Sequence, residues 1–112
     1  MTGSGPGPGP DAPDLSVSVI VVSRGRPKAL LRCLTGLGQV LYPAFEIIVV
    51  ADPAGMTALQ PDWAGRIKAV GFDQPNISAA RNLGVAQAAG DIVAFIDDDA
   101  VPEPGWLIHL TR

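Results

Sequence analysis

Residues 91–99 read Asp-Ile-Val-Ala-Phe-Ile-Asp-Asp-Asp, and this stretch decides the fold that we expect. Its apolar run, residues 92–96, is short and bounded by charge, which is typical of a buried strand in a parallel sheet. Parallel sheets bind ligands beyond the carboxyl ends of their strands, where Asp97, Asp98 and Asp99 are expected. Mg²⁺ and Mn²⁺ prefer oxygen ligands and often bind one or two carboxylates together with substrate phosphates, so the cluster predicts a divalent metal site. A solvated acidic turn is the alternative.

The composition indicates one small folded domain. The 112 residues are 47% hydrophobic, with a mean hydropathy of +0.28, which is enough for a real core. A net charge of -3 and a pI near 4.8 argue against a nucleic-acid binder, which would need a basic face. The single cysteine, Cys33, excludes a disulfide framework within the chain and a cysteine-based metal site.

No apolar run in the sequence approaches the roughly 18 residues of a membrane span, and the first residues lack a signal-peptide pattern. We therefore expect no membrane span and a cytoplasmic location, with any membrane association coming through a partner or a missing region. Residues 1–14 alternate Gly and Pro and have almost nothing to bury, so they are predicted to form a disordered tail. The folded domain is expected at residues 15–112.

Apolar periodicity predicts that strands and helices alternate. The expected strands are residues 15–22, 46–51, 67–72 and 92–96. Helices are expected from Pro27 onward, along a stripe of Leu30, Leu31, Leu34, Leu37 and Leu41, and at residues 76–89, with at best a weak helix at residues 56–65. This order predicts an α/β fold, a doubly wound, Rossmann-like and mostly parallel sheet of about four strands with flanking helices.

The helix expected at residues 76–89 carries three local signals. Ser78 is a good N-cap, and Gly90 is placed as the residue after the helix end. Gly84 lowers helix stability in the interior, which suggests close backbone packing at this position. In the first helix, Cys33 is most simply a small side chain near the core.

Polar side chains also follow the other predicted strands. Arg24 could face an anion at the mouth of the first strand, although a solvated helix face explains most of the basic residues there, which are Arg24, Arg26, Lys28 and Arg32. Asp52 could accept hydrogen bonds from a nucleobase or ribose, or could simply begin a turn. Arg81 lies near a helix N-terminus, where it would suit a diphosphate or be solvated.

Several segments together closely resemble the nucleotide-sugar half of family 2 glycosyltransferases, which are inverting enzymes of the GT-A fold. In the family's order, these are residues 19–24 before a Leu-rich helix, Tyr42-Pro43 before residues 45–50, the Ala-Ala-Arg-Asn-Leu-Gly segment at 79–84, and residues 95–99 with Pro102 and Trp106-Leu107. The resemblance covers about residues 16–110. Its elements follow the family's order, which makes the set specific.

The resemblance implies that the chain binds a nucleotide-diphosphate sugar for metal-dependent, inverting transfer to an acceptor of unknown identity. Asp97, Asp98 and Asp99 would hold the family's DxD motif. Asp97 or Asp98 would lie near the donor ribose, and Asp99, with Asp97, would bind Mn²⁺ or Mg²⁺. The ion would offset the charge that develops on the departing diphosphate, while a carboxylate would take the proton from the acceptor hydroxyl.

The resemblance further implies that Ser23 and Asp52 contact the base and that Arg81 contacts the base or the diphosphate, with Arg24 also in the donor site. One departure concerns the base. The family usually has two adjacent acidic residues after the second strand, whereas this sequence has Ala51 and then Asp52. Recognition of the base would therefore rest on one carboxylate.

A second departure is that the sequence ends at Arg112, inside a predicted helix. The resemblance therefore implies a donor-binding fragment, with the general base and the acceptor site expected beyond Arg112 and inefficient sugar transfer by the chain alone. The unfinished helix carries Trp106, Leu107, Ile108 and Leu110, which predict exposed apolar surface and self-association.

Two functions from other classes stay open. Residues 95–101 also fit the Asp-x-Asp-x-Thr/Val pattern of haloacid-dehalogenase-type phosphatases, although that motif normally opens its fold on the first strand. The other alternative is a non-catalytic nucleotide-binding or assembly module. His109, the single histidine, has no evident partner in the sequence and is expected to be structural or exposed.

Overall fold

The computed structural model describes residues 15–111, so the tail expected at residues 1–14 lies outside the described part of the chain. The α/β prediction is confirmed: four parallel strands form one sheet in the order β3-β2-β1-β4. The strands are β1 (Val17–Ser23), β2 (Phe45–Ala51), β3 (Lys68–Gly71) and β4 (Ile92–Asp97). The helices are α1 (Pro27–Leu37), α2 (Pro53–Trp63), α3 (Ile77–Ala86) and α4 (Trp106–Leu110).

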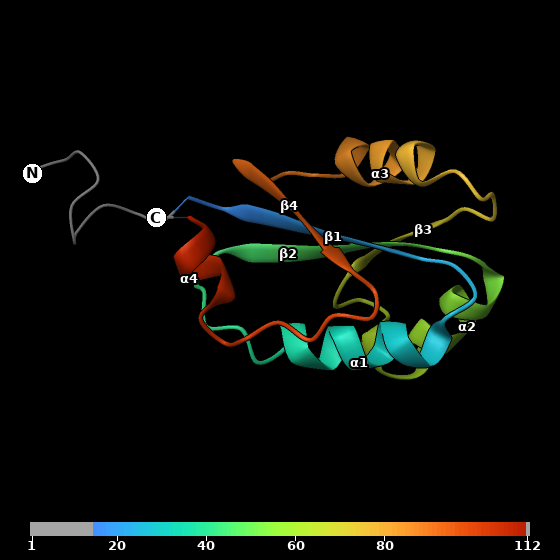
Figure 1. The fold of residues 1–112 in the computed structure, drawn as a ribbon, viewed down its shortest axis with the longest axis horizontal. Coiled ribbons are helices and arrows are strands. Elements are labelled where there is room, and N and C mark those ends of the chain that lie inside the picture. The colour runs from blue at the N-terminus through green and yellow to red at the C-terminus, as the bar shows by residue number, and fades with distance from the viewer. Residues whose placement is uncertain (1–14, 112) are drawn as a thin grey trace, which may run out of the picture.

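The sheet lies between two helical layers, with α1 and α2 on one face and α3 on the other (Figure 1). From β1 the chain steps outward through β2 to β3, and it then crosses back to place β4 on the other side of β1. The strand order therefore reverses between β1 and β4. In open α/β sheets, ligands bind beyond the carboxyl ends of the strands at such a point.

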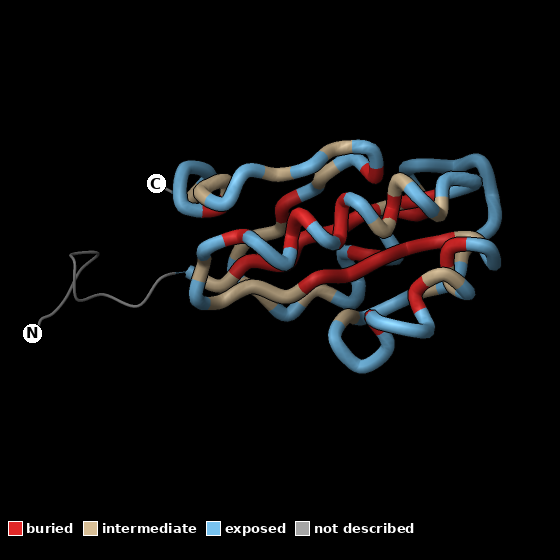
Figure 2. The backbone as a smooth tube through the Cα atoms, turned by 90° about the horizontal axis from the view of Figure 1, so that it is seen from below, coloured by how far each residue is buried: buried red, intermediate tan, exposed pale blue. Residues whose placement is uncertain are grey.

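The face of the sheet toward α1 and α2 holds the main hydrophobic core. Nearly all of β1 and most of β2 are buried (Figure 2). Alternate residues of the two strands join the core cluster with the apolar stripe of α1, as the period-two pleat of a strand requires. Cys33 is fully buried, which confirms its expected place near the core. The core residues of these three elements are Val17, Val19, Val21, Leu30, Cys33, Leu34, Leu37, Ile47, Val49 and Ala51.

The opposite face is covered by α3, which packs closely on β1. A Cβ atom added to Gly84 would lie 2.6 Å from Cγ2 of Ile20, closer than real side chains approach. The close approach predicted for Gly84 is therefore confirmed. Glycine stands at this position despite its low helix propensity, because any larger residue would keep α3 from packing this closely on β1.

The helix α1 is shorter than the leucine stripe suggested. It ends at Leu37, and Leu41 lies in the following loop with 67% of its surface exposed. The backbone N–H of Leu41 donates instead to the carbonyl of Pro104, at 2.7 Å. The prediction that Leu41 continues the buried stripe is wrong, because the chain leaves the helix before reaching it.

The segment expected to be weakly helical forms the eleven-residue helix α2. Pro53 stands in its first turn, where a missing N–H costs nothing, and the Asp52 side chain caps its N-terminus. Its buried residues are Gly55, Leu59 and Trp63, four positions apart along one face. The buried face is narrow and is interrupted by polar residues. This explains why the apolar periodicity of the sequence predicted at best a weak helix here.

The ends of α3 also differ from the prediction. Its N-cap is Asn76, whose Oδ1 accepts a hydrogen bond from the backbone N–H of Ala79 at 3.0 Å, and Ser78 lies inside the helix. The helix ends at Ala86, so Gly90 is not the residue after its end. A Cβ atom at Gly90 would meet the backbone N of Ser18 at 2.8 Å, so this glycine serves packing against β1 instead.

Glu46 ties the connection between α3 and β4 to the amino-terminal edge of the sheet. Its Oε2 accepts hydrogen bonds from the Ser18 hydroxyl at 2.6 Å and from the backbone N–H of Ala89 at 2.7 Å, and its Oε1 lies 2.9 Å from Nζ of Lys68. Burial alone would raise the pKa of Glu46, but the hydrogen bonds from Ser18, Lys68 and Ala89 and the charge of Lys68 lower it to about 2. The fold therefore keeps this carboxylate ionised.

The strand that carries the acidic cluster is less buried than its sequence suggested. Within residues 15–111, β4 pairs with β1 alone and forms an edge of the sheet. Ala94 is buried, but Phe95 keeps 44% of its surface exposed. The prediction of a buried strand is thus wrong for most of β4, because an apolar run becomes buried only where neighbouring elements of the fold cover it.

The short helix α4 packs partly onto the core. Leu107 is fully buried and Trp106 is half-buried against the core cluster, so the prediction of exposed apolar surface is wrong for these two residues. Ile108 and Leu110 remain exposed, as expected. No helix among residues 15–111 combines the length and the hydrophobicity needed to cross a membrane.

Candidate functional site at the carboxyl ends of the strands

Ser23 and Asp98 meet where the strand order reverses. Ser23 ends β1, and the pairing of β1 with β4 places Val22 opposite Asp97. The Ser23 hydroxyl donates a hydrogen bond of 2.9 Å to Oδ2 of Asp98, and both side chains are buried. A buried carboxylate requires such a partner. Two predicted site residues are therefore joined across the carboxyl ends of β1 and β4.

The turn formed by residues 24–26 contacts carboxylates from three other strand ends. Nε of Arg24 lies 3.1 Å from Oδ1 of Asp73, which follows β3. The backbone N–H of Gly25 donates to Oδ2 of Asp52, which follows β2, at 2.9 Å. Gly25 has a φ of 72°, a left-handed conformation that favours glycine. Through these contacts and those of Arg26, the turn after β1 is linked to the carboxyl ends of β2, β3 and β4.

Arg26 is a site residue that the sequence interpretation missed, since it attributed most of the basic residues there to a solvated helix face. Its Nη1 lies 3.6 Å from Oδ1 of Asp98 and 3.5 Å from Oδ2 of Asp99. The Arg26 and Asp99 side chains are 56% and 62% exposed, whereas the Asp98 side chain is only 12% exposed. The available signal was position: a cation directly after the central strand lies at the same edge as the acidic cluster.

Asp52 has a structural role that its two oxygens define. Oδ1 accepts from the backbone N–H of Gly55 at 3.1 Å, as the cap of α2, while Oδ2 accepts from Gly25. The turn-forming alternative for Asp52 therefore matches its observed contacts. Each carboxylate oxygen can accept a second hydrogen bond, so these contacts leave capacity for a ligand.

The acidic turn offers oxygen ligands but no closed cage. Within residues 15–111, no three His, Cys, Asp or Glu side chains are arranged to hold a metal ion. Asp98 is engaged by Ser23 and Arg26, whereas Asp97 and Asp99 are exposed at the end of β4. Proteins usually bind Mg²⁺ through one or two carboxylates, and substrate phosphates complete the coordination. Asp97 and Asp99 fit this arrangement.

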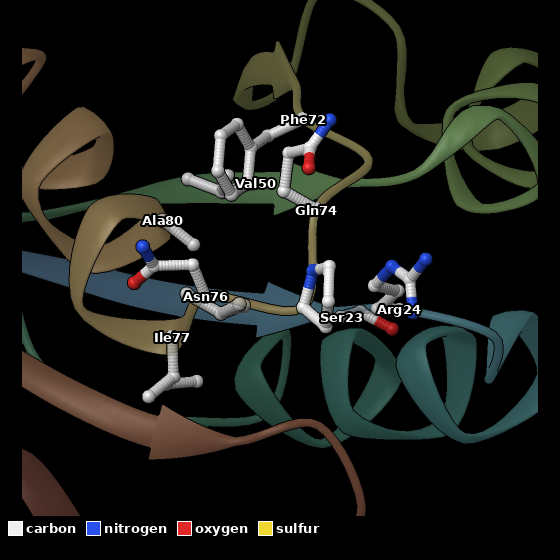
Figure 3. Close-up of a pocket in the computed structure, with 10 residues that line it drawn as sticks. Ser23, Arg24, Val50, Phe72, Gln74, Asn76, Ile77 and Ala80 are labelled. Carbon is white, nitrogen blue, oxygen red and sulfur yellow. The ribbon is translucent and has the colours of Figure 1, made fainter.

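A pocket of about 220 Å³ opens beside Ser23, at the ends of β1, β2 and β3 (Figure 3). We call it the strand-end pocket. Its walls combine apolar side chains with a few hydrogen-bonding groups, the usual make-up of a small-molecule site. It is lined by Val22, Ser23, Arg24, Val50, Phe72, Gln74, Pro75, Asn76, Ile77 and Ala80. Of these, the sequence interpretation had assigned only Ser23 and Arg24 to a site.

Arg81 lies on α3, on the face of the sheet away from α1 and α2 (Figure 1). Its guanidinium is 5.2 Å from the centroid of the Phe95 ring, a cation–π contact. Arg81, Phe95 and Asp97 also line an open groove of about 580 Å³ that runs along β4 to Trp106 and His109. The structure thus brings Arg81 near Asp97, but it does not place Arg81 in the strand-end pocket.

Cys33 lies beneath the acidic turn without taking part in it chemically. Its Sγ is 3.6 Å from the backbone carbonyl of Asp97. Burial, followed by the negative charges of Asp98, Asp99 and Asp97, raises the pKa of the Cys33 thiol to about 11. The thiol therefore stays protonated near neutral pH and is no nucleophile.

The strand order, the acidic turn and the adjoining pocket define an α/β domain with a candidate ligand site at its strand ends. Residues 18–112 match the family described as "Glycosyl transferase family 2", and the chain belongs to this family. The O-antigen biosynthesis protein RfbC of Myxococcus xanthus is 35% identical over 102 residues, a match that covers 84% of this chain and 8% of RfbC.

Solved structures confirm the GT-A fold. TarS residues 1–349 of S. aureus superposes with a TM-score of 0.74 at 25% identity, covering 86% of this chain and 31% of that one. TarS has also been solved in complex with UDP. The mannosyltransferase PcManGT of Pyrobaculum calidifontis, in complex with GDP-Man and Mn²⁺, gives a TM-score of 0.71 at 24% identity, covering 86% and 34%. The chain therefore spans about a third or less of these relatives.

Proposed function

We propose that the strand-end site binds a nucleotide-diphosphate sugar together with a divalent cation, as the donor site of an inverting glycosyltransferase. The observation that carries this proposal is the joining of Ser23 to Asp98 at the reversal of strand order, directly beside the strand-end pocket. Membership of the family and the UDP and GDP-Man complexes of its structural neighbours support the same ligand class.

The strand-end pocket would take the nucleobase. Phe72 and Ile77 offer apolar surface for a planar ring, while Gln74 and Asn76 offer amide groups for its edge (Figure 3). Ser23 and Arg24 line the same pocket. Asp52 would act chiefly by holding Gly25, with a remaining lone pair available to the base.

The acidic turn would hold the cation and the ribose. Asp99 and Asp97 are exposed oxygen donors, and we assign the metal to them. A bound divalent ion would offset the negative charge that develops on the departing diphosphate. Asp98, which is held in place by Ser23, would lie near the ribose. Arg81, which shares the groove with Asp97, would face the diphosphate.

Calorimetric titration of UDP, GDP and dTDP, with and without Mn²⁺, tests this proposal. We expect one nucleotide to bind in a metal-dependent way, and Asp99→Ala to weaken that binding by about 100-fold or more, since a metal ligand is lost. Asp62→Ala, an exposed aspartate on α2, is the matched control and should leave binding unchanged. Failure of all three nucleotides to bind to folded protein would contradict the proposal.

Nucleotide binding and turnover separate this function from the remaining alternatives. A non-catalytic binding module would bind the same nucleotide without releasing nucleoside diphosphate from the matching nucleotide sugar, so detectable release would exclude that alternative. A phosphatase would instead release phosphate from a simple monoester, and the position of the acidic cluster on β4, the fourth strand in chain order, does not support that reading.

A further inference from the structure

We propose that Arg26 is an exchangeable counter-ion of the acidic turn, which holds Asp99 in the free protein and is displaced from it when the cation and the diphosphate bind. This inference rests on the proposed donor site and concerns how its charges are arranged before a ligand arrives. Arg26 has no assigned role in that site from the sequence or from the proposed donor contacts above.

The geometry of Arg26 is that of a loosely held partner. Its Nη1 lies between Oδ1 of Asp98 and Oδ2 of Asp99, at 3.6 and 3.5 Å. Both distances are near the outer limit of an ion pair, and the Arg26 and Asp99 side chains are largely exposed. Exposed pairs of this kind contribute little to stability. The guanidinium can therefore leave Asp99 without exposing a buried group.

Asp98 differs from Asp99 in a way that gives the exchange a direction. Asp98 is buried and accepts a 2.9 Å hydrogen bond from Ser23 on Oδ2, whereas Arg26 lies against Oδ1. Asp99 has Arg26 as its one recorded side-chain partner among the described residues. A divalent cation would therefore compete with Arg26 for Asp99 and leave the contact between Ser23 and Asp98 intact.

The displaced guanidinium would remain at the strand ends, because Arg26 is the N-cap residue of α1 and its backbone carbonyl accepts from the N–H of Leu30 at 3.0 Å. A planar guanidinium is well suited to two oxygens of a diphosphate. Arg26 would then oppose the metal in the free protein and favour the nucleotide in the loaded one. Removing it should change the two affinities in opposite directions.

The test compares Arg26→Gln with the unaltered chain in two titrations. With MnCl₂ alone, Arg26→Gln should bind Mn²⁺ about two- to fivefold more tightly, since a competing exposed ion pair is gone. With saturating Mn²⁺, it should bind UDP or GDP, whichever the unaltered chain prefers, about tenfold more weakly, since a charged hydrogen bond is lost. If Arg26 had only a structural role, Arg26→Gln would bind both Mn²⁺ and the nucleotide more weakly.

Two variants control the measurement. Arg32→Gln removes the same charge from an exposed position on α1 and should change neither affinity. Arg26→Lys keeps the charge without the planar fork, so Mn²⁺ binding should return to that of the unaltered chain while nucleotide binding recovers only in part. Circular dichroism would verify that each variant is folded before titration.

The outcomes distinguish this proposal from the donor site itself. If the unaltered chain binds neither Mn²⁺ nor nucleotide, both proposals fail. If it binds both, but Arg26→Gln binds Mn²⁺ equally or more weakly, the exchange is overturned and the donor site stands. Equal effects of Arg26→Gln and Arg32→Gln would likewise overturn it, because they would reflect net charge alone.

Discussion

At the amino-terminal edge of the sheet, the Glu46 carboxylate is held by three donors at 2.6 to 2.9 Å, whereas at the carboxyl-terminal edge Asp99 has, among residues 15–111, only Arg26 as a side-chain partner, at 3.5 Å. Both are acidic residues beside the same four strands. The first is saturated by the protein, and its pKa is lowered to about 2. The second keeps its oxygens exposed. A carboxylate that the fold has already satisfied supports structure, and one that it leaves unsatisfied is available to a ligand.

The direction of the helices explains the difference. In a parallel sheet with helical crossovers, each helix begins near the carboxyl ends of the strands, so the positive ends of α1, α2 and α3 lie at the edge where Asp99 stands. Backbone N–H groups there can satisfy anions that are not part of the protein. The helices end near the other edge of the sheet, where Glu46 accepts a hydrogen bond from a backbone N–H of the loop after α3.

Replacement of Glu46 should have the largest effect on stability. Glu46→Ala leaves the Ser18 hydroxyl and the Ala89 N–H without their acceptor and Lys68 without its partner, so we expect a loss of about 3 to 4 kcal/mol in the free energy of unfolding. Urea denaturation measures this loss. Asp99→Ala, the counterpart at the other edge, should change stability by less than about 0.5 kcal/mol. Equal losses would erase the contrast between the edges.

The pH dependence of stability should follow from the same carboxylate. Because the folded pKa of Glu46 is about 2 against an ordinary value of 4.5, its contribution is fully present above about pH 5 and is lost as pH falls toward 2. The full contribution is about 3 kcal/mol. Urea denaturation between pH 5 and 2.5 should therefore be less steeply pH-dependent for Glu46→Gln than for the unaltered chain. Parallel profiles would assign the acid sensitivity to other groups.

Two glycines test the same contrast through packing. A methyl group at Gly90 would meet backbone atoms of Ser18 and Val17 at 2.8 and 2.9 Å, which cannot move away without distorting β1. Gly90→Ala should therefore cost about 2 kcal/mol. At Gly71, where β3 ends, a Cβ atom would have no neighbour within 4 Å, so Gly71→Ala should be neutral or slightly stabilising. Thermal unfolding measures both changes. A larger loss of stability in Gly71→Ala than in Gly90→Ala would contradict the prediction.

The smallest effect is expected for the ion pair of Arg24 with Asp73. Both side chains are about half exposed, so Arg24→Gln should lower the free energy of unfolding by less than about 1 kcal/mol, and less again at high salt. Nucleotide titration of the same variant sharpens the comparison, because Arg24 also lines the strand-end pocket. A stability loss as large as that of Glu46→Ala would place Arg24 among the structural contacts.

The sequence predicted the strands well because each is a short apolar run with clear boundaries, as at residues 46–51 and 92–96. It did less well where tertiary contacts decide the outcome. The helix α2 was understated because its buried face is narrow. The cap of α3 was assigned to Ser78 because Asn76 and Ser78 are both good caps, and only the chain's path from β3 selects between them.

The candidate site was predicted in part for the same reason. Asp97, Asp98 and Asp99 stood out because three carboxylates follow one apolar run, and Ser23 was reached through the resemblance to the family. Phe72 and Gln74 lie in an irregular connection with no periodic pattern, so their place in the strand-end pocket was not evident. Arg26 resembled an ordinary solvated cation until its distances to Asp98 and Asp99 were known.

By itself, the sequence determined the order of strands and helices, the acidic turn after the last strand and the family of the chain. These depend on local patterns of apolar and charged residues, which remain readable without coordinates. Only the tertiary structure decided which carboxylates accept hydrogen bonds from other parts of the protein, at Glu46 and Asp52, and which are left exposed, at Asp97 and Asp99. The physical reason is that a carboxylate's partners come from segments distant in the chain, and only folding brings those segments within hydrogen-bonding distance.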